Sequence, residues 1–312
     1  MNSTIKLSLI IPVFNEEQNI IKLFNKVIEV INKLTKDYEV IFINDGSTDK
    51  SLEIIKDLSV KGDKVRFIDF SRNFGHQLAV MAGLEHCKGK KVVIIDADLQ
   101  DPPDLIVEMY KKMDEGYDVV YAKRKKRKGE NFFKKVTAKI FYRLLSNITS
   151  FDIPIDTGDF RIINRRIIEV LKQMPEQHKY LRGQIAWMGF NQTYVEYERK
   201  ERHAGKTGYS FKKMSRFALD GITSFSDFPL KLATFMGFIV AGIAFLLILY
   251  ALYSRFIIKD FVPGWASLML SVLFIGGVQL ISIGIIGEYI SRIAANGRKR
   301  PLYLIKETNI NE

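Results

Sequence analysis

The sequence predicts an α/β protein in which a doubly wound, mostly parallel sheet is followed by a C-terminal hairpin of two transmembrane helices. In residues 1–125, short β-branched runs alternate with helical patterns, which is the rhythm of βαβ units. Further along, the stretches Leu232–Tyr253 and Trp265–Gly287 contain no charged side chain. Each is long enough to cross the roughly 30 Å hydrocarbon core of a bilayer as a helix, so a multi-pass membrane protein is expected.

Strands and helices alternate in order through the first part of the chain. The expected strands are Leu7–Val13, Tyr38–Ile43, Val65–Phe70, Lys91–Ile95 and Asp118–Ala122. The first helical pattern between them runs from Asn15 to about Leu34, and the second follows Asp49 and ends at about Val60. The third covers His76–His86 and the fourth covers Asp104–Glu115. Right-handed crossovers place the loops after the first, second and fourth strands along one edge of the sheet, where open α/β sheets bind ligands.

The remainder of the chain carries a basic segment, further helices and the membrane hairpin. After the basic residues 123–128, an amphipathic helix is expected over about 131–146, helices near 165–174 and 180–188, and a strand near 193–198. The proposed domains are an α/β domain over residues 1–210, interfacial amphipathic helices over 211–230, a transmembrane hairpin over 231–291 with spans at about 232–253 and 265–289, and a tail over 292–312.

Charged residues that flank the hydrophobic stretches indicate how the chain is oriented in the membrane. The loop between the spans has only Arg255 and Lys259 as positive residues, whereas several lysines and arginines precede the first span and follow the second. The positive-inside rule therefore places the α/β domain and the tail in the cytoplasm, at the inner (plasma) membrane. The single cysteine, Cys87, excludes an internal disulfide and suits that reducing compartment.

Net charge and histidine spacing limit the classes of partner. The net charge of +12 suits membrane lipids, nucleotide phosphates or nucleic acid, and the two expected spans make nucleic acid the poorest of the three. The histidines show no metal-ligand spacing and are expected to be packing or surface residues: His76, His86, His178 and His203.

Two carboxylates follow the fourth expected strand. Alternation along that strand points Asp96 and Asp98 to the same side, at the edge where ligands bind. Together they suit one hard divalent cation that holds a diphosphate. The alternative is a solvated acidic turn before a helix, with Asp101 as the N-cap and Pro102 at the first helical position.

Polar turns also end the first and second expected strands. In Pro12–Glu17, the proline interrupts the strand ladder and Asn15 is able to cap the next helix. In Asn44–Asp49, Asp45 is able to accept a hydrogen bond from a nucleobase, and Gly46 lets the backbone approach a ligand closely. Plain turn chemistry is the alternative for both motifs, and neither motif alone decides between the two interpretations.

Four motifs occur along the chain in the order Pro12–Glu17, Asn44–Asp49, Asp96–Pro103 and Thr157–Arg161. In this order they resemble the family 2 glycosyltransferases with a GT-A fold, and more narrowly the polyprenyl-phosphate glycosyltransferases. That group includes bacterial undecaprenyl-phosphate glucosyltransferases and dolichyl-phosphate mannose synthases. The catalytic resemblance covers about residues 5–210, and the two C-terminal spans match the bacterial branch.

The resemblance implies that the first two motifs bind the donor nucleotide. Pro12, Asn15 and Glu17 would line the nucleotide pocket, and Asp45 would contact the base. A nucleotide diphosphate sugar is therefore the expected donor, with UDP-glucose favoured.

The resemblance also implies a divalent cation. Asp96 and Asp98 would hold Mg²⁺ or Mn²⁺ against the donor diphosphate, with Gln100 as a further ligand. This role fits the chemistry, because cleavage of a sugar–diphosphate bond places negative charge on the leaving nucleoside diphosphate, and a metal ion stabilises that charge.

Basic residues further along match positions that handle phosphate in the family. Arg124 and Arg127 fall in a stretch like its Arg-x-x-Arg-x-Gly-Glu pattern, and arginine forks suit phosphate oxygens. A solvated basic loop near anionic lipid is the alternative. Arg202 opens a segment like the family's Arg-x-x-Gly-x-Ser-Lys-Tyr pattern, in which Gly208 stands in place of the usual lysine and Lys206 is left to supply the charge.

Asp159 matches the position proposed as the catalytic base of the family. The acceptor oxygen would belong to a lipid monophosphate, whose second pKa is about 6, so that it needs little deprotonation. Asp159 would then orient the acceptor or the sugar hydroxyls. The alternative is a carboxylate that caps the helix expected at Asn164–Leu171.

The expected activity is inverting, metal-dependent transfer of one hexose from a nucleotide diphosphate sugar to undecaprenyl phosphate, and inversion comes from the resemblance. Donors that carry mannose, an N-acetylhexosamine or amino-arabinose are the near alternative. A membrane-tethered nucleotide-binding protein without catalysis is the distant one. Glycines in the second span, such as Gly276 and Gly284, are able to let the spans pack closely with each other or with a second copy, so a homo-oligomer is expected. Glycines that are merely tolerated in the span are the alternative.

Overall fold

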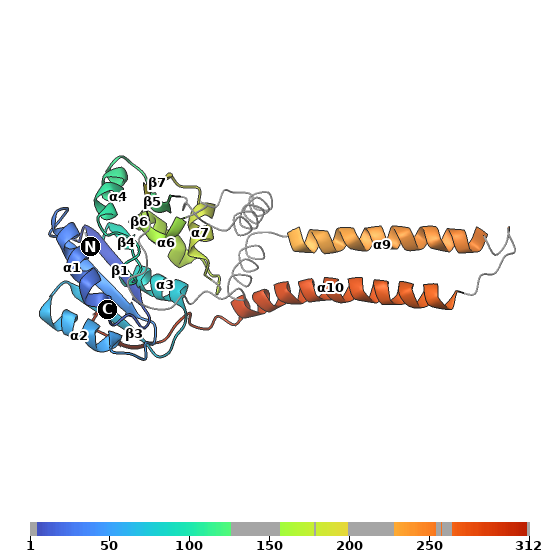
Figure 1. Ribbon diagram of the computed structural model, residues 1–312, viewed down its shortest axis with the longest axis horizontal. Coiled ribbons are helices and arrows are strands. Elements are labelled where there is room, and N and C mark those ends of the chain that lie inside the picture. The colour runs from blue at the N-terminus through green and yellow to red at the C-terminus, as the bar shows by residue number, and fades with distance from the viewer. Residues whose placement is uncertain are drawn as a thin grey trace. The chain divides into compact units, whose positions relative to one another are not determined.

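The computed structural model describes residues 5–125, 157–177, 179–198, 228–253, 257 and 264–310 of the 312 in the chain. Among these, the residues up to 198 and those from 300 onward form one compact unit, and those from 228 to 299 form a second. The first unit contains the sheet, and the second contains two long helices (Figure 1). The sheet-bearing unit is therefore built from both ends of the chain.

One sheet of eight strands organises the first unit. The strands are β1 (Leu7–Val13), β2 (Tyr38–Asn44), β3 (Val65–Phe70), β4 (Lys91–Ile94), β5 (Val119–Arg124), β6 (Thr157–Asn164), β7 (Gln192–Tyr197) and β8 (Ile305–Thr308). They lie in the order β7-β5-β6-β4-β1-β2-β3-β8. The strands from β3 to β4 run parallel to one another, as do β5 and β7. Antiparallel pairing is limited to β6, between β4 and β5, and to β8 beside β3.

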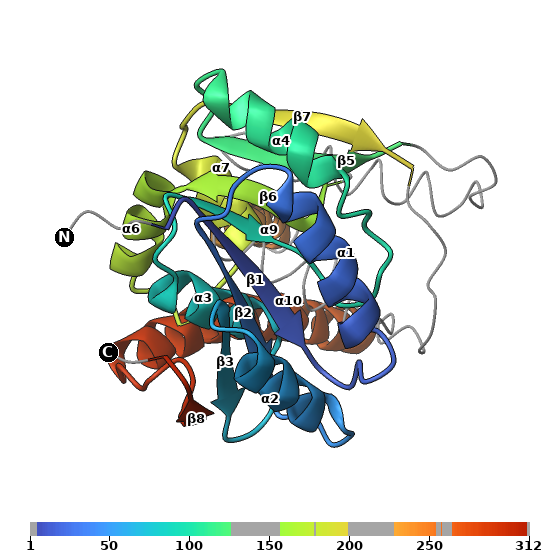
Figure 2. The same cartoon turned by 90° about the vertical axis from the view of Figure 1, so that its left-hand side faces the viewer.

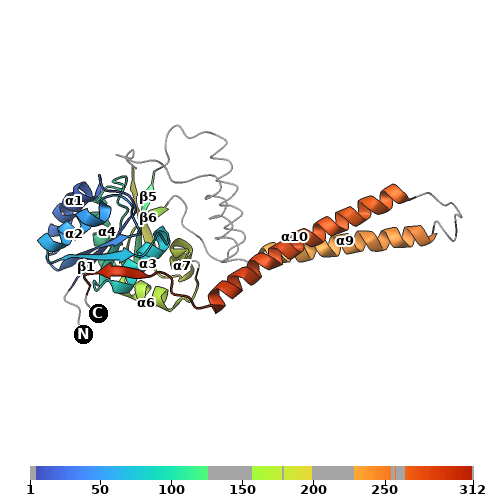
Figure 3. The same ribbon diagram turned by 90° about the horizontal axis from the view of Figure 1, so that it is seen from below.

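Helices cover both faces of this sheet. One face carries α1 (Ile20–Asn32), α2 (Ser51–Lys61) and α4 (Leu105–Asp114), and the other carries α3 (His76–His86), α6 (Arg165–Gln173) and α7 (Leu181–Trp187) (Figure 3). Successive residues of the central strand β1 enter opposite cores, so that Leu9 packs on the first face and Ile10 on the second. Both are fully buried, as expected of a parallel strand that is covered on both sides. The predicted doubly wound α/β fold is confirmed.

The end of β1 differs in detail from the prediction. Pro12 does not interrupt the strand, because it lies opposite Ile43 within the β1–β2 ladder. The ladder between β1 and β4 extends only to Ile10, so Pro12 lies beyond it and its missing N–H removes no hydrogen bond to β4. Asn15 does not cap the following helix either, since α1 begins at Ile20 after Asn19.

Two strands were not predicted. The motif Thr157–Arg161 was expected to precede a helix directly, and instead it forms the first part of β6. No strand was predicted in the tail, which returns to the sheet as β8 (Figure 2). The antiparallel position of β6 matters for the site, because it places this motif beside the end of β4.

Side chains of the tail attach it to β3 more firmly than the short strand β8 alone. The amide oxygen of Asn309 accepts a hydrogen bond from the backbone N–H of Phe67 at 2.8 Å, and its amide nitrogen donates to the carbonyl of Val65 at 3.2 Å. The ring of Tyr303 stacks on Phe70 with 4.9 Å between the centroids. The tail therefore covers the edge of the sheet that β3 would otherwise expose.

The second unit is a pair of long apolar helices, α9 (Phe228–Tyr253) and α10 (Trp265–Gly297), which lie side by side (Figures 1 and 3). Within them, Pro229–Leu247 and Phe274–Gly297 are long and apolar enough to cross a membrane. Large apolar side chains point outward, and Phe238 and Leu280 are 74% and 72% exposed. A surface of this kind is typical of contact with lipid or with another protein.

In the described part of the chain, Gly276 and Gly284 of α10 lie in no close contact with α9. A methyl group added at Gly276 or Gly284 would meet no heavy atom within 4 Å in the described part of the chain. This finding favours the alternative, that the glycines are merely tolerated in α10, over close packing of the two spans on each other. Their use in contact with a second copy, and with it the homo-oligomer, stays a prediction.

Burial of Cys87 leads to a testable prediction about the sheet-bearing unit. The side chain is 4% exposed and its thiol donates to the carbonyl of Leu84. Burial, only partly opposed by Arg165, raises the pKa of this thiol to about 11. At pH 8 the folded protein should hold about a hundredfold less thiolate than the unfolded chain, and should react with a disulfide reagent more slowly by at least that factor.

Labelling of the native protein in detergent and of the protein unfolded in denaturant would measure this difference. Because the chain has a single cysteine, the signal has only one source. Equal rates in the two states would contradict the buried position of Cys87.

Candidate active site

The antiparallel register of β4 and β6 brings two of the predicted motifs together. Ile94, the last residue of β4, lies opposite Arg161 in β6. Because the two strands run in opposite directions, Asp96 and Asp159 continue this register toward the same point of the sheet edge. Asp96 comes two residues after the end of β4, and Asp98 lies in the turn that follows. Strand alternation therefore does not extend to Asp98, contrary to the prediction that it orients both carboxylates.

Asp159 is held through both of its carboxylate oxygens. Its Oδ1 accepts a hydrogen bond from Nη2 of Arg161 at 2.9 Å and lies 3.6 Å from Nη2 of Arg182. Its Oδ2 accepts a hydrogen bond from Nε2 of Gln77 at 3.2 Å and lies 3.1 Å from Nε2 of His76. These donors come from β6, from α7 and from the first turn of α3. Asp159 is therefore fixed in position by three elements of the fold.

The same contacts determine how basic Asp159 is. Burial by itself would raise its pKa, but the hydrogen bond and charge of His76, with the charges of Arg182 and Arg161, hold the pKa of Asp159 well below its usual range. Burial disfavours the charged form of His76, yet Asp96 and Asp159 raise the pKa of this imidazole to about 9. Asp159 is thus a carboxylate at neutral pH and a weak proton acceptor.

The alternative role of Asp159 as a helix cap is wrong. Asn164 occupies the N-cap of α6, and its side chain accepts a hydrogen bond from the backbone N–H of Ile167 at 3.2 Å. Asp159 lies earlier in the chain, inside β6. Its carboxylate is therefore available for a role in the site.

Asp96 and Asp98 offer the oxygen ligands that a hard cation requires. The Oδ1 atom of Asp96 is buried and has no hydrogen-bond donor among the described residues. Burial raises the pKa of Asp96, and the nearby carboxylates of Asp159 and Asp98 add to this rise, while His76 opposes it. A cation beside Asp96 would offset that accumulated negative charge.

The residues near Asp96 fit Mg²⁺ or Mn²⁺ that is shared with a substrate. The Oδ1 atom of Asp98 accepts a hydrogen bond from the backbone N–H of Gln100 at 3.1 Å, which folds this turn around the carboxylate. Within the described ranges, no group of three or more His, Cys, Asp or Glu side chains is arranged to hold a metal ion. A cation at this place would therefore also need oxygens from a bound phosphate, as is usual for Mg²⁺.

The loops after β1 and β2 are bonded to each other. The side-chain oxygen of Asn15 accepts a hydrogen bond from the backbone N–H of Thr48 at 2.8 Å, and Glu17 accepts one from the backbone N–H of Lys50 at 3.0 Å. Asn15 also has a positive φ of 55°. Asn15 and Glu17 thus shape the paired loops, and their contact with a nucleotide, like that of Pro12, stays a prediction.

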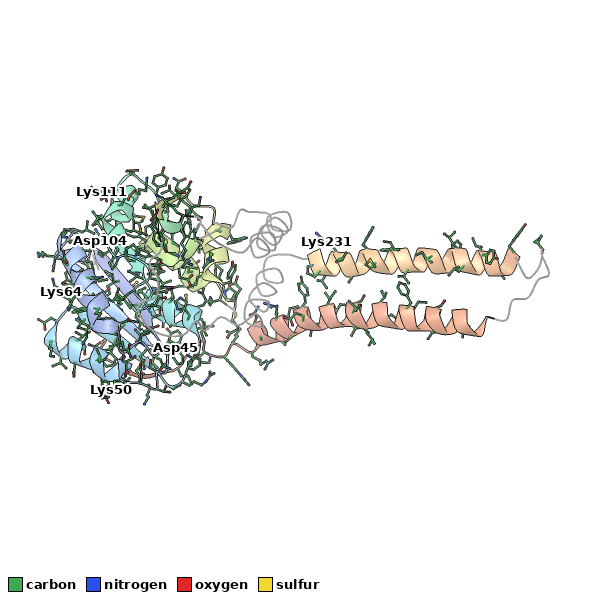
Figure 4. The ribbon with its side chains drawn as sticks, in the orientation of Figure 1. Asp45, Lys50, Lys64, Asp104, Lys111 and Lys231 are labelled. Carbon is green, nitrogen blue, oxygen red and sulfur yellow. The ribbon has the colours of Figure 1, made fainter. Side chains whose placement is uncertain are left out.

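Asp45, labelled in Figure 4, holds the segment that leads into α3. Its Oδ1 accepts a hydrogen bond from the backbone N–H of Phe74 at 2.6 Å, and its Oδ2 accepts one from Gly75 at 3.0 Å. Burial raises the pKa of Asp45, and these two backbone bonds oppose the rise. The next residue, Gly46, has a φ of +66°, and a Cβ there would lie 2.5 Å from the backbone of Arg72. The predicted contact of Asp45 with a nucleobase is not tested by these bonds.

Arg124 lies over the motif that contains Asp159. Its Nε donates to the hydroxyl of Tyr197 at 3.2 Å. A Cβ on Gly158 would lie 2.8 Å from Nη2 of Arg124, so the glycine makes room for the guanidinium. Arg124 is thus placed beside the motif that contains Asp159, and its contact with an acceptor phosphate stays a prediction.

Several predictions lie outside the described residues. They concern one predicted phosphate-binding residue after β5, the segment in which a glycine replaces the usual lysine, and two predicted helical regions. The residues are Arg127 for the first, Arg202, Lys206 and Gly208 for the second, and 131–146 and 211–227 for the helical regions.

Comparison with known proteins decides the family. Residues 8–172 match the family model described as glycosyl transferase family 2, and residues 228–293 match the model described as the GtrB C-terminal hairpin. The chain belongs to glycosyltransferase family 2. The predicted family and the predicted GT-A fold with a C-terminal helix pair are confirmed, and the protein is a glycosyltransferase.

Similar family 2 proteins extend over nearly the whole chain. An uncharacterized glycosyltransferase of Bacillus subtilis, YkcC, is 48% identical over 99% of this chain and 95% of its own length. A bactoprenol glucosyl transferase of Shigella phage SfX is 43% identical over 96% of this chain and 99% of its own length. A prophage bactoprenol glucosyl transferase homolog of Escherichia coli is 42% identical over 96% of this chain and 98% of its own length.

Sequence reasoning missed most of the partners of Asp159 in this family 2 glycosyltransferase. Arg161 belongs to a recognised motif, but its contact with the carboxylate depends on the unpredicted strand β6. His76 was expected to be a packing or surface residue, and the structure places its Nε2 between Asp159 and Asp96. Gln77 and Arg182 carried no signal in the sequence, because nothing in residue spacing reveals a contact between α3, α7 and β6.

Proposed function

We propose that this family 2 glycosyltransferase transfers one glucose from UDP-glucose to undecaprenyl phosphate at the cytoplasmic face of the inner membrane, with inversion at the anomeric carbon. The observation that carries the proposal is the meeting of Asp96 and Asp159 at one point of the sheet edge, where His76 lies within 3.5 Å of both carboxylates. The bactoprenol glucosyl transferases, at 42% and 43% identity, support glucose as the sugar and a polyprenyl phosphate as the acceptor.

The acceptor phosphate acts as the nucleophile in this proposal. One of its oxygens forms a bond to the anomeric carbon while the bond from that carbon to the diphosphate oxygen breaks, and the electron pair leaves with UDP. A phosphate monoester has a second pKa of about 6, so at neutral pH most of it carries no proton on the attacking oxygen. Asp159, with its lowered pKa, then serves to orient groups rather than to accept a proton.

Phosphate groups of both substrates have suitable partners. Asp96 and Asp98, with Gln100, would hold Mg²⁺ or Mn²⁺, which when bound would neutralise charge on the departing diphosphate. Arg124, close to the Asp159 motif, would bind the acceptor phosphate together with Arg127, Arg202 and Lys206.

The helix pair supports a location at the membrane. The windows in α9 and α10 that are long enough to span a bilayer have none of their residues buried. Lys231 stands in the first turn of α9 (Figure 4), and Arg292 and Arg298 lie at the far end of α10. With this distribution of positive charge, the sheet-bearing unit faces the cytoplasm in the proposal, where nucleotide sugars are available.

Transfer of labelled sugar into lipid tests the proposal directly. The full-length protein in detergent is mixed with undecaprenyl phosphate and Mg²⁺ or Mn²⁺, and is offered UDP-glucose, UDP-N-acetylglucosamine, UDP-galactose or GDP-mannose. We expect organic-soluble label from UDP-glucose alone, complete loss of that label with EDTA, and a β-linked glucosyl phosphate as the product.

Three results would count against the proposed reaction. If only GDP-mannose gave labelled lipid, the transferred sugar would be mannose and not glucose. An α-linked product would exclude a single displacement with inversion at the anomeric carbon. A folded protein that transfers no sugar from any of the four donors would contradict the assigned activity. Folding is checked by the thermal unfolding profile and by the low reactivity of Cys87.

A further inference from the structure

We propose that His76 and Gln77 are positioning residues that hold Asp159 for the transfer reaction. The inference rests on the proposed function and adds to it two residues from a different part of the chain. Both side chains stand in the first turn of α3. Both approach the same atom, Oδ2 of Asp159, His76 at 3.1 Å and Gln77 at 3.2 Å.

The backbone before α3 is built to present these two side chains. Gly75 precedes the helix with a φ of +105°, a conformation that side chains other than glycine rarely adopt. Its N–H, with that of Phe74, is held by the carboxylate of Asp45. Since Asp45 is 3% exposed, this anchor is fixed in the body of the sheet-bearing unit. The start of α3 is thus set by the loop that ends β2.

Gln77 connects Asp159 to a further element. Its amide nitrogen donates to Asp159, while its amide oxygen accepts a hydrogen bond from the backbone N–H of Leu181 at 3.2 Å. Leu181 is the first residue of α7, and the next residue, Arg182, lies 3.6 Å from the other oxygen of Asp159. One glutamine therefore sets both the carboxylate and the start of the helix that brings Arg182.

His76 connects Asp159 to the predicted donor side of the site. Its Nε2 is buried and lies 3.5 Å from Oδ1 of Asp96, in addition to its contact with Asp159. The imidazole thus stands between the carboxylate assigned to the donor cation and the carboxylate assigned to the acceptor. A side chain in this place sets the separation of the two substrates, to which the rate of an in-line displacement is sensitive.

Kinetics of four variants test the role of this pair. We expect His76→Ala and Gln77→Met to lower kcat about a hundredfold, which is the size of effect that small misplacement produces, with KM for UDP-glucose changed less than threefold. His76→Gln keeps an N–H donor and is expected to recover much of the loss. The control is His86→Ala, in the last turn of the same helix, which should leave kcat unchanged because the only hydrogen bond of the His86 ring among the described residues is to the carbonyl of Ala82.

Two measurements separate positioning from a role in metal binding or in folding. Mn²⁺ affinity, followed by electron paramagnetic resonance in the presence of UDP, should change less than threefold in His76→Ala. In a thermal double-mutant cycle with Asp159→Asn, the losses in Tm should fall short of additive, because the two changes remove the same contact.

The inference would be overturned by wild-type kcat in His76→Ala and Gln77→Met, by loss of Mn²⁺ binding together with activity, or by additive losses in Tm. Failure of the proposed function is distinguishable from failure of the inference. If wild type transfers no sugar, the proposed function fails while the thermal cycle still decides the contact. If wild type is active and the variants equal it, only the inference fails.

Discussion

Replacement of Asp98 by asparagine is expected to lower sugar transfer about a thousandfold and to weaken Mn²⁺ binding strongly. The asparagine keeps the size of the side chain and an oxygen that can accept the hydrogen bond from the backbone N–H of Gln100, so the turn after β4 should survive. What it removes is one of the two negative charges assigned to the cation. Charge stabilisation by a bound metal ion contributes several kcal/mol to such a reaction, and a loss of about 4 kcal/mol corresponds to the expected factor.

A nearby aspartate provides the matched control for this change. Asp104 precedes α4, is exposed and forms no side-chain cap, so Asp104→Asn removes the same charge from the surface (Figure 4). This variant should transfer sugar at the wild-type rate. Transfer by Asp98→Asn within tenfold of wild type, with unchanged Mn²⁺ affinity, would show that Asp98 is not a metal ligand.

Most of the sheet could be predicted because burial leaves a clear pattern in the sequence. All residues of β1 are buried, and a strand covered on both faces has a nearly continuous apolar sequence. The first five strands accordingly lie within two residues of their predicted positions. β8 left no such pattern, because its four residues are all exposed and it pairs only with the edge strand β3. Its position is fixed by side chains such as Tyr303, whose partner Phe70 is remote in sequence.

The candidate site was predictable only where its residues follow a strand. Asp96 and Asp98 could be proposed because they come directly after an apolar run, at the edge where parallel strands end. His76 could not, because its relation to Asp159 follows from the antiparallel register of β4 and β6 together with the start of α3. Neither feature has a signature in local periodicity. Tertiary pairing therefore supplied what the spacing of residues could not.

Replacement of Arg161 by methionine is expected to destabilise the sheet-bearing unit by about 3–5 kcal/mol, the usual cost of removing one partner of a buried ion pair. Arg161 is 1% exposed, and its Nη2 donates to Oδ1 of Asp159 at 2.9 Å and to the carbonyl of Gly158 at 3.1 Å. Methionine fills a similar volume but leaves the carboxylate and the carbonyl without this donor. For a unit of this size, the loss corresponds to a fall in Tm of about 10 °C, measurable by intrinsic fluorescence in detergent.

The reason for this loss can be tested by removing the other partner as well. In Asp159→Asn the buried charge is gone, so adding Arg161→Met to that variant should cost clearly less stability than it does in wild type. Arg66 is half-buried on β3, and its side chain forms no hydrogen bond or ion pair among the described residues. It gives the control variant Arg66→Met, for which a change below about 1 kcal/mol is expected. Equal losses for Arg161→Met in both backgrounds would mean that packing of the guanidinium on Tyr121, and not the ion pair, keeps Arg161 in β6. A smaller loss in the Asp159→Asn background would show that the strand is stabilised by the same contact that holds the carboxylate in the site.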